Sequence, residues 1–187
     1  MNQDEVVGCV VAALVEVGVP YMVAGSFASN LHGVPRMTQD ADIVVDADEA
    51  AVLRLVHLLE RDFYLSEEAA LDAVRRRRMF NAIHFDTGFK VDLIIKKNRP
   101  FSTEELRRRE PGPLAGKQVD FATAEDTILT KLEWAKLGDS ERQYADAVGL
   151  IQVQEPRLDW PYLRRWATDL GVAHLLERAR RVSPFRC

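Results

Sequence analysis

Residues 21–46 constrain this chain most, because they join two apolar runs through a Gly-Ser turn and bring two carboxylates into alternate positions. The first run, residues 21–24, predicts a buried strand that ends at Gly25-Ser26, where small residues let the backbone approach a bound group closely. Asp40 and Asp42 stand where the second apolar run begins. Since residues i and i+2 of a strand point to the same side, both carboxylates are expected on one face of a sheet.

A third carboxylate, Asp92, lies inside the apolar run of residues 89–95. A carboxylate buried in a strand is costly unless it is paired or binds a metal ion. Three carboxylates that can meet across adjacent strands favour metal-assisted transfer of a nucleotide. Two structural alternatives are that Asp40 and Asp42 belong to an exposed acidic turn, and that Asp92 pairs with Lys90 or with an arginine at the sheet edge.

The residues that follow the Gly-Ser turn predict a short helix over residues 26–32. Backbone N–H groups at a helix N-terminus form a good binding site for phosphate. Gly25 and Ser26 are therefore suited to contact the phosphates of a nucleotide. The alternative, that Ser26 simply caps the helix, describes the same local geometry.

The charge of the chain limits the partners it can have. A formal net charge of −4 argues against a general cationic coat for nucleic acid, and 47% hydrophobic residues suit a globular core. Three arginine-rich stretches lie within residues 75–78, 107–109 and 178–181, so local binding of RNA is not excluded. The alternative for each stretch is a solvated helix face.

The cellular setting is expected to be cytoplasmic. Two cysteines, Cys9 and Cys187, make neither a disulfide framework nor a zinc motif. The N-terminus is acidic and lacks the basic start of a signal peptide. Residues 17–35 are uncharged, but glycines and a proline interrupt them, which excludes a spanning helix in this stretch.

The apolar periodicity predicts an α+β fold, a mixed α/β sheet with flanking helices that is followed by a helical C-terminal part. We expect two domains, residues 1–121 and residues 122–187. The predicted strands are residues 21–24, 41–46, 79–86, 89–95 and 117–121, with a two-residue turn at Thr87-Gly88. The predicted helices are residues 4–17, 26–32, 48–61, 67–77, 123–137, 159–170 and 171–182, with one more from Ser140.

These motifs resemble the nucleotidyltransferase superfamily that includes DNA polymerase beta, and within it the small bacterial AbiEii-like group. The resemblance rests on Gly25-Ser26, thirteen intervening residues, Asp40-Ala41-Asp42, and the later Asp92. Arg36-Met37-Thr38 matches the Arg-x-Thr that often precedes the paired carboxylates. The second half is similar to a group of bacterial proteins that share three short segments, here Ala124-Glu125-Asp126, Lys131-Leu132 and Arg142-Gln143-Tyr144-Ala145-Asp146.

The resemblance implies a nucleotidyltransferase fold and a magnesium-dependent site, with two ions expected. Asp40, Asp42 and Asp92 would be the metal ligands and catalytic residues, Asp92 serving the attacking hydroxyl. The nucleotide-binding residues would be Gly25, Ser26, Arg36, Thr38 and Lys131, with Asp146 in a supporting role. The alternatives are that Lys131 is an ordinary surface lysine, and that Asp146 is structural and pairs with Lys131 or Arg142.

The function that follows is transfer of a nucleoside monophosphate from a nucleoside triphosphate such as ATP to an acceptor hydroxyl or phosphate. Three acceptors remain open: the 3′ end of RNA or tRNA, a protein hydroxyl, and a small molecule such as an aminoglycoside. The arginine stretches slightly favour RNA. The alternative from another class is a catalytically idle nucleotide-binding or interaction module, for example one component of a toxin–antitoxin pair with an antitoxin-like protein as partner.

Overall fold

The computed structural model describes residues 1–182, so Cys187 lies outside the described residues. The chain forms two compact units. The first unit contains residues 1–27 and 37–121, and the second contains residues 28–36 together with the chain from residue 122 onward. The helix α2 (Gly25–His32) begins in the first unit and ends in the second.

The first unit is built on a mixed β-sheet, as the sequence predicts. Within residues 1–182, seven strands form one sheet in the order β3-β4-β5-β2-β1-β7-β6. The β2–β5 and β1–β7 pairs are parallel and the other pairs are antiparallel. The strands are β1 (Tyr21–Val23), β2 (Asp40–Val45), β3 (Phe63–Tyr64), β4 (Met79–His84), β5 (Lys90–Ile95), β6 (Glu110–Leu114) and β7 (Lys117–Phe121).

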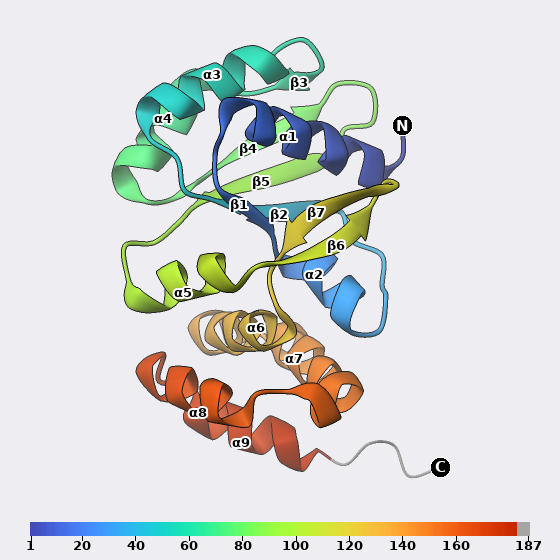
Figure 1. The fold of residues 1–187 in the computed structure, drawn as a ribbon, viewed down its shortest axis with the longest axis vertical. Helices are drawn as coiled ribbons and strands as arrows, with labels where there is room; N and C mark the ends of the chain where they lie inside the picture. The colour runs from blue at the N-terminus through green and yellow to red at the C-terminus, as the bar shows by residue number, and fades with distance from the viewer. Residues whose placement is uncertain (183–187) are drawn as a thin grey trace. The chain divides into compact units, whose positions relative to one another are not determined.

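Four helices of the first unit pack around this sheet: α1 (Gln3–Val17), α3 (Glu49–Leu59), α4 (Glu67–Arg76) and α5 (Pro100–Arg108). Figure 1 shows α1, α3 and α4 on one face of the sheet and α5 on the other. Local sequence explains the bounds of α1, because Asn2 and Glu5 form a capping box at its start and Gly18 ends it in the left-handed conformation.

The alternation of residues in β2 and β5 determines which side chains face the core. Ala41, Ile43 and Val45 are fully buried, and so are their cross-strand partners on β5, Val91, Leu93 and Ile95. A slip of one residue would turn these apolar side chains to the opposite face, so the register of this pair is strongly specified. The residues of the other parity, which include the carboxylates of interest, therefore share the opposite face of the sheet.

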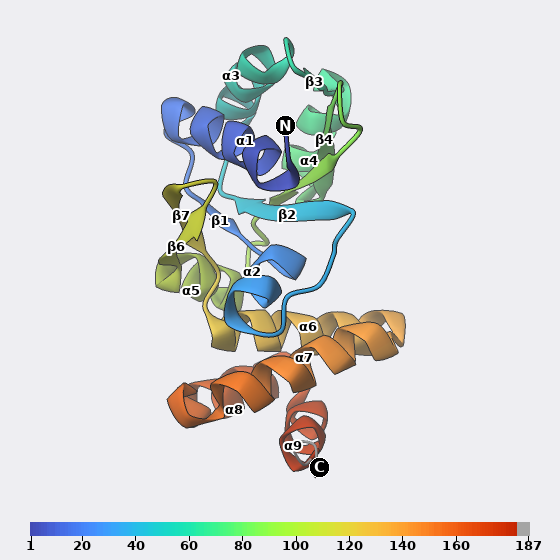
Figure 2. The same cartoon turned by 90° about the vertical axis from the view of Figure 1, so that its right-hand side faces the viewer.

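The second unit is helical. It contains α6 (Ala124–Gly138), α7 (Glu141–Gln154), the 3₁₀ turn η1 (Glu155–Arg157), α8 (Trp160–Asp169) and α9 (Ala173–Arg181). Helices α6 and α7 lie side by side (Figure 2). The end of α2 joins this unit through His32, whose Nε2 lies 2.7 Å from the Ala122 carbonyl oxygen and whose own carbonyl accepts a hydrogen bond from Gln154. None of the helices within residues 1–182 is both long and apolar enough to cross a membrane.

Within residues 1–182, four elements are not predicted by the sequence: β3, β6, α5 and the 3₁₀ turn η1. Strand β6 contains Pro111 and Pro113, which normally argue against a strand, but β6 lies at the edge of the sheet, where proline is tolerated. The predicted two-residue turn between β4 and β5 is wrong in length. These strands end at His84 and begin at Lys90, so residues 85–89 form the connection.

Candidate active site

The paired carboxylates and the third one meet on neighbouring strands, as the sequence predicts. Asp40 and Asp42 begin β2, which pairs in parallel with β5. In the register of this pair Asp42 is opposite Asp92, and Asp40 is opposite Lys90. Since adjacent strands lie about 4.8 Å apart and all four residues have the same parity, their side chains form one compact group on one face. We call this group the acidic face.

Gly25 is fitted closely to Asp42. Its φ is +54°, and a Cβ atom built on it would lie 1.8 Å from Asp42 Oδ2. The Ala24 N–H donates a 2.8 Å hydrogen bond to the Asp42 carbonyl oxygen, which holds the turn against β2. Only glycine allows this approach. Because α2 begins at Gly25, the positive end of a helix adjoins the acidic face, and Ser26 is buried in its first turn.

Asp92 is almost fully buried and is held by two nitrogen donors. The Lys90 ammonium lies 2.8 Å from its Oδ2, and the Asn81 side-chain amide donates to its Oδ1. The predicted alternative of a Lys90–Asp92 pair is thus present, although β5 lies inside the sheet and not at its edge. The role of Asn81 was missed. The signal for it is its register opposite Asp92, which depends on the true length of the β4–β5 connection.

Lys90 also faces the paired carboxylates. Its Nζ atom lies 3.7 Å from Asp40 Oδ2. The hydrogen bond to Asp92 raises the pKa of Lys90 above its ordinary value, and attraction by Asp92, Asp40 and Asp42 raises it further. One ammonium thus lies close to three carboxylates and offsets part of their negative charge.

Thr38 contacts Asp40. Its hydroxyl donates to the Asp40 carbonyl oxygen at 2.9 Å and lies 3.3 Å from Asp40 Oδ1. The Thr38 carbonyl oxygen accepts a hydrogen bond from the Gln3 side chain at 3.0 Å, and Thr38 is buried. The contacts of Thr38 therefore orient a carboxylate of the acidic face, and its expected contact with the nucleotide stays a prediction.

The donor set suits a divalent cation at the paired carboxylates. The Asp40 side chain is 42% exposed and lies on the same face of β2 as Asp42, so both can bind an ion that also meets substrate phosphates. Asp92 differs, because its two oxygens already accept from Asn81 and Lys90. Within residues 1–182 no three His, Cys, Asp or Glu side chains converge as a ready-made metal cluster. The fit is therefore to Asp40 and Asp42.

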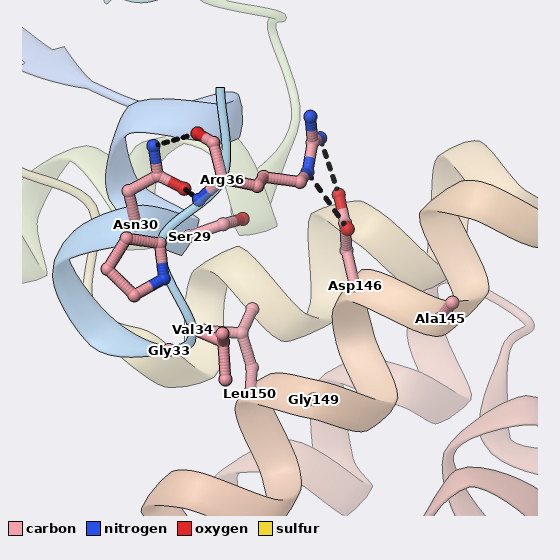
Figure 3. Close-up of a pocket in the computed structure, with 10 residues that line it drawn as sticks. Ser29, Asn30, Gly33, Val34, Arg36, Ala145, Asp146, Gly149 and Leu150 are labelled. Atoms are coloured by element: carbon pink, nitrogen blue, oxygen red, sulfur yellow. Dashed lines mark hydrogen bonds and ion pairs between the residues drawn. The ribbon is translucent and has the colours of Figure 1, made fainter. Parts of the chain in front are cut away.

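Arg36, Lys131 and Asp146 meet in the second unit, and we call them the Asp146 cluster (Figure 3). The Arg36 guanidinium donates two hydrogen bonds to Asp146, at 3.3 Å to Oδ1 and 2.9 Å to Oδ2. The Lys131 ammonium reaches the same Oδ2 at 2.8 Å, and its side chain is only 5% exposed. Lys131 is thus no surface lysine, and its predicted pairing with Asp146 is present.

The electrostatics of the Asp146 cluster follow from these contacts. Burial alone raises the pKa of Asp146, but hydrogen bonds from Arg36 and Lys131 outweigh burial and bring the net pKa below its ordinary value. Asn30 fixes the backbone of Arg36 by two hydrogen bonds, of 3.0 Å to its N–H and 2.8 Å to its carbonyl oxygen. Arg36 is therefore held at its backbone by Asn30 and at its guanidinium by Asp146.

A cavity of about 220 Å³ adjoins this cluster. Figure 3 shows Val34 and Leu150 beside Arg36 and Asp146 in its wall. The lining residues are Ser29, Asn30, Gly33, Val34, Pro35, Arg36, Ala145, Asp146, Gly149 and Leu150. The residues expected to bind nucleotide thus fall into two groups, the acidic face with Gly25, Ser26 and Thr38, and the Asp146 cluster.

By sequence, the chain matches neither a protein-family profile nor a curated protein. Several solved structures, among them the following three, are similar to it in fold. An antigenic nucleotidyltransferase-like protein from Paracoccidioides brasiliensis has a TM-score of 0.60 at 15% identity, over 98% of this chain and 94% of that one. The lincosamide adenylyltransferase LnuA with lincomycin bound has a TM-score of 0.55 at 11% identity, over 82% and 98%.

The third is ANT(2'')-Ia in complex with adenylyl-2''-tobramycin, with a TM-score of 0.54 at 17% identity over 96% of this chain and 95% of that one. At these identities the similarity concerns the fold. The chain has the nucleotidyltransferase fold, which confirms the expected fold class. The more specific AbiEii-like grouping stays a prediction.

Proposed function

We propose that this protein is a nucleotidyltransferase that moves a nucleoside monophosphate from a nucleoside triphosphate to an acceptor hydroxyl. The observation that carries the proposal is the acidic face. Asp42 lies against Gly25 at the start of a helix, and Asp92 lies in register with Asp42 on the next strand. This arrangement puts carboxylates for a cation beside a helix N-terminus for phosphates.

Each residue has a distinct task in this proposal. Asp40 and Asp42 hold the divalent cation, Mg²⁺ in the cell, which when bound stabilises charge on the triphosphate and its leaving group. The backbone at Gly25-Ser26 binds phosphate oxygens, and Thr38 keeps Asp40 in one orientation. Asp92 accepts the proton of the attacking hydroxyl. We place this chemistry in residues 1–121 and treat residues 122–187 as a helical C-terminal subdomain.

For the acceptor, we favour a small hydroxylated molecule over RNA. At least one arginine of each stretch that suggested RNA has a partner within the protein. Arg75 pairs with Glu49 and Arg107 with Glu104, while Arg178 lies 4.7 Å over the Tyr144 ring. Together with the net charge of −4, this leaves less cationic surface for phosphate contacts than the sequence suggests.

Two of the similar structures support the same choice. The complex of ANT(2'')-Ia holds adenylyl-tobramycin and LnuA holds lincomycin, and both match this chain over 82% or more of its length. Each of those proteins is also matched over 95% or more of its own length. Two proteins of this fold and of about this length are thus known with a small acceptor or its adenylyl product bound.

A labelling experiment tests the proposal. The protein is incubated with each α-labelled nucleoside triphosphate, Mg²⁺ and one acceptor pool at a time: hydroxyl-rich antibiotics, total tRNA, or no acceptor other than itself. We expect label on a small molecule. Label on tRNA or on the protein would support nucleotidyl transfer but contradict the proposed acceptor. Nucleotide binding without any transfer would favour the catalytically idle module.

The matched variants for this assay are Asp42→Ala and Asp46→Ala. Asp46 directly follows β2, at the opposite end of the strand from Asp40, and pairs with Lys96 at 3.3 Å. Transfer should disappear in Asp42→Ala and persist in Asp46→Ala. Equal activity in the two variants would contradict the proposed site.

A further inference from the structure

Lys90 occupies the position where a cation shared by two strands would lie. Its Nζ atom is 2.8 Å from Asp92 Oδ2 on its own strand and 3.7 Å from Asp40 Oδ2 on the neighbouring strand. An ion that joined Asp40 to Asp92 would have to lie close to the same point. A lysine that only shields one buried carboxylate needs no second carboxylate, so the bridging position is informative.

We infer that Lys90 is a built-in cation that replaces the second divalent ion of the site, so that the protein uses a single Mg²⁺ held at Asp40 and Asp42. This inference rests on the proposed nucleotidyl transfer and deepens it. It also revises the expectation of two ions.

The charge balance supports one ion. Before nucleotide binds, three carboxylates and one ammonium leave two formal negative charges on the acidic face, which one divalent ion neutralises. A second divalent ion between Asp40 and Asp92 would lie within a few ångströms of the ammonium, where like charges repel strongly in a partly buried site. The Lys90 side chain is 37% exposed, so burial does not force it into this position.

The hydrogen bonds of Asp92 support the same conclusion. One of its oxygens accepts from Lys90 and the other from Asn81, so two nitrogen donors hold a carboxylate whose side chain is only 6% exposed. A second ion at Asp92 Oδ2 would compete with the Lys90 ammonium for that oxygen. In the proposed reaction Lys90 therefore positions Asp92 and supplies positive charge near the attacking hydroxyl.

Counting bound ions tests this inference without an activity assay. Mn²⁺, which electron paramagnetic resonance detects in its free form, is titrated into the protein with a saturating non-hydrolysable ATP analogue. The count is the number of ions bound per nucleotide–protein complex. We expect one ion in the wild-type protein and two in Lys90→Met, because the variant leaves the carboxylates of Asp40 and Asp92 open to a second ion.

Two further variants serve as controls. Lys96→Met removes a lysine that pairs with Asp46 at 3.3 Å beyond the ends of the same two strands, and it should keep one ion. Lys90→Arg keeps the positive charge and should also keep one. If Lys90→Met fails to fold, Lys90→Gln takes its place, and two ions in the wild-type complex would still overturn the inference.

The possible outcomes separate this inference from the proposed function. Two ions in the wild-type complex, or one ion in a folded Lys90→Met, overturns the role of Lys90 even if labelled transfer is observed. Absence of both nucleotide and ion binding in the wild-type protein overturns the proposed function, and the inference with it.

Discussion

The acidic face and the Asp146 cluster both combine carboxylates with basic side chains. Carboxylates are in excess on the acidic face, and basic side chains are in excess in the Asp146 cluster. On the acidic face three carboxylates share Lys90, whereas in the Asp146 cluster one carboxylate is shared by Arg36 and Lys131. The first group has excess negative charge and the second has excess positive charge. The first therefore has capacity for a cation, and the second for an anion.

Burial separates the two groups further. The Lys90 side chain is 37% exposed, whereas that of Lys131 is 5% exposed and depends on Asp146 for compensation. Loss of a charge should therefore have different consequences in the two places. On the acidic face it should alter ligand binding and chemistry, and in the Asp146 cluster it should alter stability first.

The largest effect is expected for Asp42→Ala. Transfer should fall by about 10³-fold or more, on the order of 4 kcal/mol of transition-state stabilisation, because a ligand of the activating cation is lost. The fold should remain intact, and the melting temperature without metal should stay the same or rise, since one of several mutually repelling carboxylates is gone. Single-turnover rates and thermal melting check the two parts, and a fall in melting temperature would show that Asp42 is structural.

The next effect is a loss of stability in Asp146→Asn. This change leaves the buried Lys131 ammonium without a charged partner and should cost about 3–5 kcal/mol in the free energy of unfolding. The control is Glu177→Gln, which breaks a pair with Arg164 whose side chains are 43% and 52% exposed and should cost less than about 1 kcal/mol. Urea unfolding measures the free energy of unfolding of both variants. Similar small losses would show that the Asp146 cluster contributes no more to stability than an exposed ion pair does.

Gly25→Ala should disturb the acidic face sterically. The new Cβ would lie 1.8 Å from Asp42 Oδ2, so strain in a positive-φ backbone and overpacking should together cost about 3 kcal/mol. Gly88 has a similar φ of +66° with nothing within 4 Å of a new Cβ, so Gly88→Ala should cost about 1 kcal/mol. The free energy of unfolding and the transfer rate are measured for both variants. Equal losses in the two would mean that the close packing of Gly25 on Asp42 contributes neither to stability nor to transfer.

These expectations show which parts of the molecule can be predicted from sequence. The parity of Asp40, Asp42 and Asp92 within apolar runs was enough to place them on one face, because the buried residues between them leave only one register. The contacts of Asn81 could not be predicted in the same way. They depend on the pairing of β4 with β5, which the connection of residues 85–89 determines.

The Asp146 cluster shows the opposite limit. The pairing of Lys131 with Asp146 is between adjacent helices and was foreseen, but Arg36 lies 110 residues from Asp146 in sequence, and no periodicity reports such a contact. Strand β6 was missed because its prolines are acceptable only at a sheet edge, a property of the assembled sheet. Non-local arrangement, and not local propensity, accounts for these misses.

The smallest effect, and the sharpest test of the comparison, is expected for Lys131→Met. The variant keeps the Arg36–Asp146 pair, so its loss of stability should be smaller than that of Asp146→Asn. If the excess positive charge of the cluster contacts phosphates, affinity for a non-hydrolysable nucleoside triphosphate should fall about tenfold, or 1.4 kcal/mol, at low salt. Added salt should reduce the difference in affinity between the variant and the wild type, because screening weakens a charge–phosphate contact.

The matched control is Lys136→Met, which removes a lysine at an exposed position on the same helix. Equal affinities in all three proteins would assign Lys131 to the stability of the second unit and leave Arg36 as the phosphate contact to test.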